Sequence, residues 1–210
     1  MRLRRRSEVP DEGEGALDEV DATGDDGSVV GPYDADELPE DGAERVDLGS
    51  LLIAPEPGRE LRLQVDEASG TVQSVVLAGS DGALELRAFA APRNGDLWSE
   101  ARPQIASEVS GRGGTATERE GRWGPELVCQ VQVRTSDGKT GTQDSRIIGI
   151  NGPRWLLRAT MLGKPATDVD GAGEWEDLLS RVAVRRGTQA MPVGEPLTVT
   201  MPPQARRVER

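Results

Sequence analysis

Several arginines lie on segments where apolar and polar residues alternate, and together they could bind an anion. Arg62, Arg87, Arg146, Arg154 and Arg158 all fall on expected strands. A guanidinium carries a permanent positive charge and a planar fork of N–H donors that fits carboxylate and phosphate groups. Two interpretations stay open: the side chains converge on one anion-accepting face, or they are ordinary residues on the solvent side of a sheet.

The turn Gly121-Arg122-Trp123-Gly124-Pro125 is a second candidate for binding. A tryptophan in a turn can be partly exposed, and tryptophan and arginine are enriched among the residues that dominate the energy of protein interfaces. The opposite interpretation is core packing, because large aromatic side chains suit helix–sheet contacts. The candidate binding surface comprises Arg122, Trp123, Arg146, Arg154, Trp155 and Arg158.

The residue types that usually carry catalysis are scarce. The chain has no histidine, which removes the commonest general acid–base group and the commonest metal ligand. Cys129 is the only cysteine, so neither an intrachain disulfide nor a cysteine-based zinc site can form. Its apolar, alternating neighbours indicate a buried small hydrophobe. We therefore expect no cofactor, no metal site and no catalytic residues, and we favour a protein that is not an enzyme.

Two smaller motifs have simpler explanations than a ligand site. Asp168 and Asp170 precede an expected helix and could help to bind a hard cation, but such a pair is common in a loop with a helix cap. Gly111, Gly113 and Gly114 follow an expected helix instead of preceding one, and they match no phosphate-loop spacing. They indicate a helix end and a turn.

The elements that must position these residues are strands joined by tight turns. Segments of period-2 alternation, the pattern of half-buried strands, are separated by turn motifs such as Ser80-Asp81-Gly82 and Asn151-Gly152. Strands are expected at 61–65, 71–77, 84–90, 127–133, 146–150 and 154–161, shorter ones at 182–185 and 197–201, further turns at Ser69-Gly70 and Ser136-Asp137-Gly138-Lys139, and a loop at 164–173.

Two helices are expected between the strands. Apolar residues recur every four positions over 97–109, with Asp96 as the helix cap. Pro103 leaves two alternatives for this helix, a kink or a regular part that begins near Arg102. The second helix spans 175–182. Antiparallel strands with two helices predict an α+β fold, mainly one antiparallel sheet with the helices packed on it.

The charge of the chain is concentrated at its start. Residues 1–44 hold fifteen acidic residues and four arginines, a net charge of −11, whereas residues 45–210 hold 22 acidic and 21 basic residues. A highly charged segment with few apolar residues cannot bury enough surface to fold. We expect a disordered acidic tail at 1–44, one α+β domain at 45–202 and a basic tail at 203–210. The acidic tail either solubilises the protein, or it attracts a basic partner or acts as a mimic that competes with nucleic acid.

Several segments resemble an uncharacterised actinobacterial family, domain of unknown function 3710. The resemblance rests on residues 46–51, 86–92, 97–100, 113–115, 144–146 and 152–158, and the segment Gly152-Pro153-Arg154-Trp155 is its most distinctive part. The element order is also similar to the Mog1/PsbP-type α/β/α sandwich, a set of mainly binding and accessory proteins. The family resemblance implies no activity, although a neighbouring dUTPase gene in such genomes hints at nucleotide metabolism.

These observations predict a cytoplasmic interaction or accessory module whose partner is another protein. The basic start, Met1–Arg6, lacks the apolar segment of a secretion signal, and no stretch approaches the roughly 20 apolar residues of a membrane helix. The alternative is a small anionic-ligand-binding protein, or a weakly signalled enzyme, linked to nucleotide metabolism. A nucleic-acid partner is disfavoured by the sequence pI of about 4.6.

Overall fold

The computed structural model describes residues 31–134, 138 and 140–202. Within this part strands dominate, and the element order confirms the predicted α+β class. The segment 1–30, the expected basic tail 203–210 and, apart from Gly138, the expected turn at 136–139 lie outside the described residues.

Seven strands form one antiparallel sheet in the order β4-β5-β6-β10-β9-β8-β7. Their bounds are Glu60–Val65 (β4), Val72–Ala78 (β5), Gly82–Ala90 (β6), Thr115–Gly121 (β7), Gly124–Arg134 (β8), Thr140–Gly152 (β9) and Trp155–Gly163 (β10). Strands adjacent in sequence pair with one another in the groups β4-β5-β6 and β7-β8-β9-β10. The two groups meet where β6 pairs with β10 along its whole length, from Trp155 opposite Ala90 to Gly163 opposite Gly82.

A smaller sheet brings together segments that are far apart in the sequence. Its strand order is β1-β11-β3-β2, with bounds Tyr33–Asp34, Ala183–Val184, Leu51–Ile53 and Val46–Asp47. β1 runs parallel to β11, and the 3-10 helix η1 (Ala35–Glu37) follows it. Residues 33–37, which fall within the segment expected as a tail, therefore form described elements. Pairing with a distant strand orders this short acidic segment, although it has no apolar period of its own.

Two longer helices and one short helix complete the described elements. They are α1 (Leu97–Gly111), α2 (Lys164–Thr167) and α3 (Gly173–Ser180), and α2 occupies part of the segment expected as a loop. As predicted, Asp96 caps α1, and its carboxylate accepts a hydrogen bond from the Ser99 backbone N–H at 3.0 Å. The helix begins at Leu97 and contains Pro103, so the alternative start near Arg102 is wrong.

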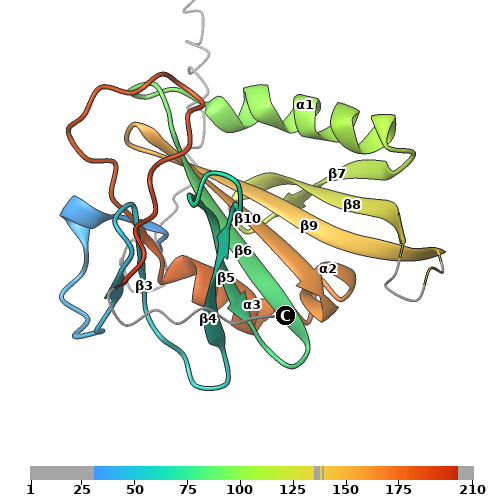
Figure 1. The fold of residues 1–210 in the computed structure, drawn as a ribbon, viewed down its shortest axis with the longest axis horizontal. Coiled ribbons are helices and arrows are strands. Elements are labelled where there is room, and N and C mark those ends of the chain that lie inside the picture. The colour runs from blue at the N-terminus through green and yellow to red at the C-terminus, as the bar shows by residue number, and fades with distance from the viewer. Residues whose placement is uncertain (1–30, 135–137, 139, 203–210) are drawn as a thin grey trace, which may run out of the picture. The chain divides into compact units, whose positions relative to one another are not determined.

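The longer helices lie on opposite faces of the large sheet. α1 packs on β7, β8 and β9 through an apolar cluster that includes Trp98, Leu127 and Leu156. α3 and the small sheet pack on the other face, in a larger core that includes Trp155 and Trp175. Figure 1 shows α3 behind β4–β6 and α1 alongside β7 and β8. This arrangement confirms the expected antiparallel sheet with two helices packed on it.

The turn between β9 and β10 differs from the expectation. β9 continues through Asn151-Gly152, and the turn itself is Pro153-Arg154. Arg154 has a φ of 66°, in the left-handed region that side chains rarely occupy. Asn151 instead contacts the start of α1, where its side-chain oxygen accepts a hydrogen bond from the Trp98 backbone N–H at 3.2 Å. The sequence motif therefore marks the hairpin correctly but places its turn two residues too early.

Candidate functional site

Arg146 lies inside the protein, and this corrects its expected place on an exposed surface. Its guanidinium, in a residue that is 1% exposed, donates to the two carboxylate oxygens of Glu126 at 2.7 and 2.8 Å and to Glu176 at 2.6 Å. Burial acts to lower the pKa of Arg146, but the hydrogen bonds and charges of the two carboxylates outweigh it, so the pKa is raised. Arg119 adds a further cation 3.2 Å from Glu126. This internal ion cluster joins α3 to β8 and β9.

Trp155 is also buried, which corrects its expected place on the candidate binding surface. It is 1% exposed, and its indole N–H donates to a carboxylate oxygen of Asp34 in β1 at 2.8 Å. Core packing, the alternative interpretation of the tryptophans, is correct for Trp155, as it is for Trp98 and Trp175, which are 3% and 2% exposed. This hydrogen bond therefore links β1 to β10.

Arg122 and Trp123 form the turn between β7 and β8, and both contact other parts of the chain. The Trp123 indole N–H donates to the Gly31 carbonyl oxygen at 3.0 Å. The Arg122 guanidinium donates to Asp177 of α3 at 2.8 Å, and its carbon lies 5.1 Å from the centre of the Trp123 ring. The charge of Arg122 is thus already balanced, and Trp123 is half-buried instead of standing free in solvent.

Arg158, another member of the predicted surface, lies beside a second arginine. It lies directly opposite Arg87 in the pairing of β10 with β6, and both side chains are half-buried. Other arginines of the sheet, such as Arg62 and Arg146, form ion pairs. Arg87 and Arg158 form none with any carboxylate in the described ranges, and the Arg87 Nε is buried without a hydrogen-bond partner.

The two guanidiniums lie on the same face of the sheet as α1. Phe89 and Leu156 belong to the apolar cluster under α1, and Arg87 and Arg158 follow two residues away on the same strands. Side chains two residues apart on a strand point to the same face. α1 packs on β7, β8 and β9, so it covers the side of this face that lies away from β4 and β5. We call Arg87, Phe89 and Arg158 the arginine pair site.

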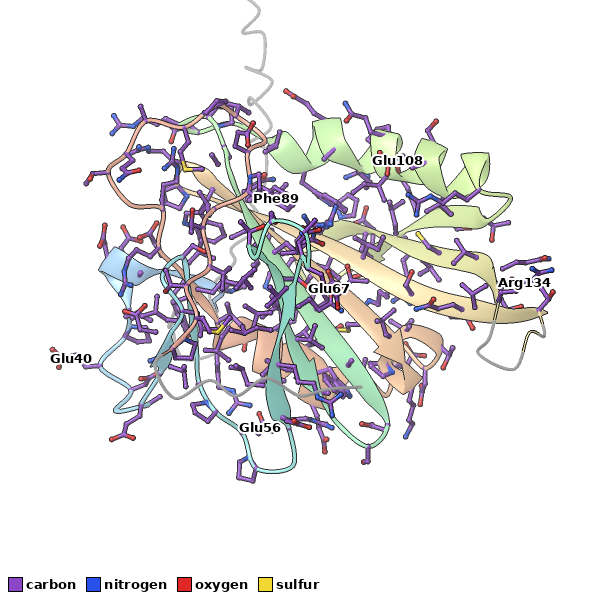
Figure 2. All side chains as sticks on the ribbon, viewed as in Figure 1. Glu40, Glu56, Glu67, Phe89, Glu108 and Arg134 are labelled. Atoms are coloured by element: carbon purple, nitrogen blue, oxygen red, sulfur yellow. The ribbon has the colours of Figure 1, made fainter. Side chains whose placement is uncertain are left out.

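Phe89 gives the arginine pair site an aromatic wall. The guanidinium carbons of Arg87 and Arg158 lie 5.6 and 5.3 Å from the centre of its ring, within the range of cation–π attraction. Figure 2 labels Phe89 of β6 and Glu108 of α1. The ring keeps both cations close to an apolar surface, which limits their hydration and strengthens their interaction with an anion.

The electrostatics of the site favour a bound anion. The pKa of Arg158 is lowered, first by burial of the side chain and then by the positive charge of Arg87, and the charges of Glu85 and Glu108 oppose this only in part. Like charges placed directly opposite on neighbouring strands destabilise a sheet. An anion between the two guanidiniums would relieve that repulsion.

Arg62 shares this face but is balanced by its own neighbour. It lies in the row of residues that passes through Val76 and Glu85, and it donates to Glu60 at 2.6 Å. An open hollow of about 450 Å³ lies beside it, lined by Gly58, Arg59, Glu60, Arg62, Ala78 and Gly79. The hollow includes neither arginine of the pair. Arg154 lies in the turn between β9 and β10, so it takes no part in the strand pairing that brings Arg87 and Arg158 together.

The remaining candidate residues have structural roles. Cys129 is buried, and burial raises the pKa of its thiol, which disfavours the reactive thiolate. Asp168 accepts a hydrogen bond from the Gly171 N–H at 3.0 Å, as in an ordinary loop. Among the described residues no group of three or more potential metal-ligating side chains comes together.

Comparison with known proteins identifies the family. Over residues 31–208 the chain matches the model of a family described as Protein of unknown function (DUF3710). The chain belongs to DUF3710. A search of curated proteins gave no match. The matched region begins at Gly31 and so includes β1, which agrees with the contacts that β1 makes to β11 and Trp155. The predicted family is confirmed, and the Mog1/PsbP-type likeness stays a prediction.

In this DUF3710 protein no helix of the described residues is long and apolar enough to cross a membrane. The sequence pattern alone indicates part of the arginine pair site. The alternation of β6 puts Glu85, Arg87 and Phe89 on one side of that strand, and Arg158 is a predicted surface residue. The missing information was the pairing of β6 with β10, since strands 70 residues apart can pair in many registers.

Proposed function

We propose that this protein is a cytoplasmic, non-enzymatic interaction module that binds an acidic segment of another protein at the arginine pair site. The carrying observation is the cross-strand pair Arg87–Arg158, two half-buried cations without an ion-pair partner among the described residues. A sheet keeps such a pair at a cost in stability. A role in binding an anion would explain why the protein keeps a pair that lowers its stability.

The residue types and the surroundings of the site also support a protein partner. Arginine and aromatic side chains are over-represented where interfaces gain most of their energy. The site lies on sheet surface next to α1, and the hollow nearby is open and lined by other residues. Small molecules usually bind in more enclosed sites. A small anionic ligand, or an enzyme linked to nucleotide metabolism, is the alternative that the same two charges would serve.

The test is chemical crosslinking and capture with the full-length protein in native lysate. Three forms are compared: wild type, the double variant R87Q/R158Q, and the control R62Q, which removes an arginine of the same face that already has its carboxylate. We expect wild type and R62Q to crosslink to an acidic segment of a partner, and R87Q/R158Q to lose that crosslink. The same captured proteins, or none, from wild type and the double variant would overturn the proposal.

A further inference from the structure

The two guanidiniums of the arginine pair site can together bind a group with more negative charge than one carboxylate carries. Arg87 and Arg158 together carry two positive charges, and they are opposite each other on β6 and β10. Glu85 and Glu108 act on Arg158 without forming an ion pair with it, and a single carboxylate would place only one negative charge between the two guanidiniums. Residues directly opposite in an antiparallel pair have Cβ atoms roughly 5 Å apart, so both guanidiniums can reach one group.

From this geometry we infer that the anion bound by Arg87 and Arg158 is a phosphate dianion, carried on a phosphorylated side chain of the partner. The inference rests on the proposed function and names the chemical group that the same site recognises. A phosphate monoester carries a charge of about −1.5 to −2 near pH 7 and three acceptor oxygens, so it balances both cations. Each guanidinium can offer two parallel N–H donors to its oxygens.

The surroundings of the pair agree with a compact, strongly charged ligand. The buried Nε of Arg87 has no hydrogen-bond partner among the described residues and is a donor still to be satisfied. The charged groups that act on Arg158 are Arg87, Glu85 of β6 and Glu108 of α1, and neither glutamate forms an ion pair with it. Phe89 limits water on one side. A dianion therefore gains two charge-assisted contacts in a partly dehydrated site.

The first test uses inorganic phosphate and sulfate as probes of the full-length protein. Arginine Nε–H signals in NMR spectra are followed during titration of wild type, R87Q/R158Q and the control R62Q. We expect both anions to shift the same two arginine signals, those of Arg87 and Arg158, in wild type and R62Q. In the double variant, which lacks these two arginines, we expect no arginine signal to shift. Equal shifts in all three proteins, or no shift in wild type, would contradict a site at this pair.

A change of pH separates phosphate from the other charged groups. Between about pH 7.5 and 5.5 the inorganic phosphate probe gains a proton, as a phosphate monoester does, whereas sulfate stays a dianion. Glu85, Glu108 and the arginines act on both probes alike. We expect phosphate binding to weaken several-fold at the lower pH and sulfate binding to stay constant. Parallel behaviour of the two anions would argue against recognition of the dianionic phosphate.

The source of the phosphate is decided by comparing three ligands. They are an acidic peptide with one phosphoserine, the same peptide with glutamate in place of phosphoserine, and a nucleoside monophosphate. We expect the phosphopeptide to bind at least tenfold more tightly than either of the others. Equal affinity of the two peptides would refute the inference while leaving the proposed acidic partner intact. Tightest binding of the nucleotide would refute the protein partner and leave the phosphate site.

Thermal unfolding supplies a readout that a purely structural role of the arginines would not give. Without ligand, R87Q is expected to unfold at the same or a higher temperature than wild type, because a like-charge contact is removed. Phosphate should raise the unfolding temperature of wild type and R62Q, since a ligand that binds only the folded state stabilises it. A lower unfolding temperature for R87Q alone would show that the pair stabilises the sheet and would overturn its role as a site.

Discussion

At the scale of single residues, two arginines on neighbouring strands have opposite environments. Arg146 lies among Glu126, Glu176 and the main core, whereas Arg158 lies on the other face opposite Arg87. Ile147 and Ile148 are both apolar, so the alternation of β9 does not show which side of Arg146 faces inward. The sequence therefore predicts a strand arginine in each case. Only the packing of α3 over one face separates an internal charge from a surface charge.

Replacing Arg146 by methionine is expected to destabilise the fold strongly. The change leaves Glu126, which is fully buried, without its main partner. Breaking a buried ion pair from one side costs about 3–5 kcal/mol, because the remaining charge is uncompensated. Denaturant unfolding monitored by tryptophan fluorescence measures this loss.

Two further variants show whether the loss comes from the buried charge. The double variant R146M/E126Q removes both charges and should regain part of the stability. R62M breaks the exposed pair of Arg62 with Glu60, and it should have little effect on stability, because solvent screens such a pair. If R146M and R62M had the same small effect, the ion cluster would not hold α3 in place.

At the scale of elements, the fit of α1 on the sheet depends on one glycine. A Cβ atom added at Gly149 of β9 would overlap the indole ring of Trp98. The Trp98 ring therefore lies directly on the backbone of β9, and its N–H donates to the Pro125 carbonyl oxygen at 2.6 Å. Gly149 appears in the sequence as an ordinary interruption of an apolar strand, so this contact has no signal before the helix is placed.

Gly149→Ala is expected to loosen α1 and to destabilise the protein by about 1–3 kcal/mol, the usual cost of overpacking. Gly111→Ala is the matched control, because Gly111 ends α1 and nothing lies near its added Cβ. Replacing a helical glycine by alanine stabilises by up to about 1 kcal/mol. Thermal unfolding of both variants measures these changes in stability. Equal unfolding temperatures would mean that Trp98 can move aside without a loss of stability.

The cap of α1 makes a contribution to stability that depends on pH. Hydrogen bonds from Ser99 lower the pKa of Asp96 below its ordinary value of 3.8. A carboxylate with a lowered pKa stabilises the folded state above its unfolded pKa, and this contribution is lost as the pH falls through the lowered value. We expect wild type to lose stability relative to D96N as the pH falls below about 4, since asparagine caps a helix without titrating.

Unfolding free energies of wild type and D96N over that pH range test the cap. Asn151 supports the comparison, because its amide donates to Asp96 at 2.7 Å and can donate equally to an asparagine oxygen. A constant difference between the two proteins at all pH values would mean that the Asp96 charge contributes nothing. The sequence predicted this cap correctly because its signal is local, whereas β7, with the polar sequence TATEREG, was missed because only its pairing with β8 defines it.

At the scale of the whole molecule, charge composition places the beginning of the fold too late. The acidic residues continue to Glu44, yet Tyr33–Asp34 pairs with Ala183–Val184. Composition reports whether a segment can fold alone, and this segment needs a strand about 150 residues away. Long-range pairing of two-residue strands leaves no local period. β6 and β10 do show a local period, but their pairing, which creates the arginine pair site, is also long-range and is not specified by either strand alone.

Removing residues 1–44 is therefore expected to weaken the fold, whereas removing residues 1–30 should not. The longer deletion takes away the Asp34 acceptor of Trp155, the Gly31 acceptor of Trp123 and the bond from the Tyr33 N–H to the Val182 carbonyl oxygen, all between 2.8 and 3.0 Å. A donor left buried without its partner costs about 1–3 kcal/mol. In a domain of this size each kcal/mol lowers the unfolding temperature by roughly 2–4 °C.

Scanning calorimetry of the full chain, of residues 31–210 and of residues 45–210 should then give two similar transitions and one that is lower by about 6 °C or more. Asp34→Ala in the full chain separates the two causes, because it removes the carboxylate that accepts from Trp155 and from the Asp36 backbone N–H but keeps the β1–β11 pairing. A drop in D34A close to that of residues 45–210 would assign the loss to the contacts of the Asp34 carboxylate. Unchanged unfolding of residues 45–210 would mean that the body folds without β1, and that the fold begins at β2 as the charge pattern indicates.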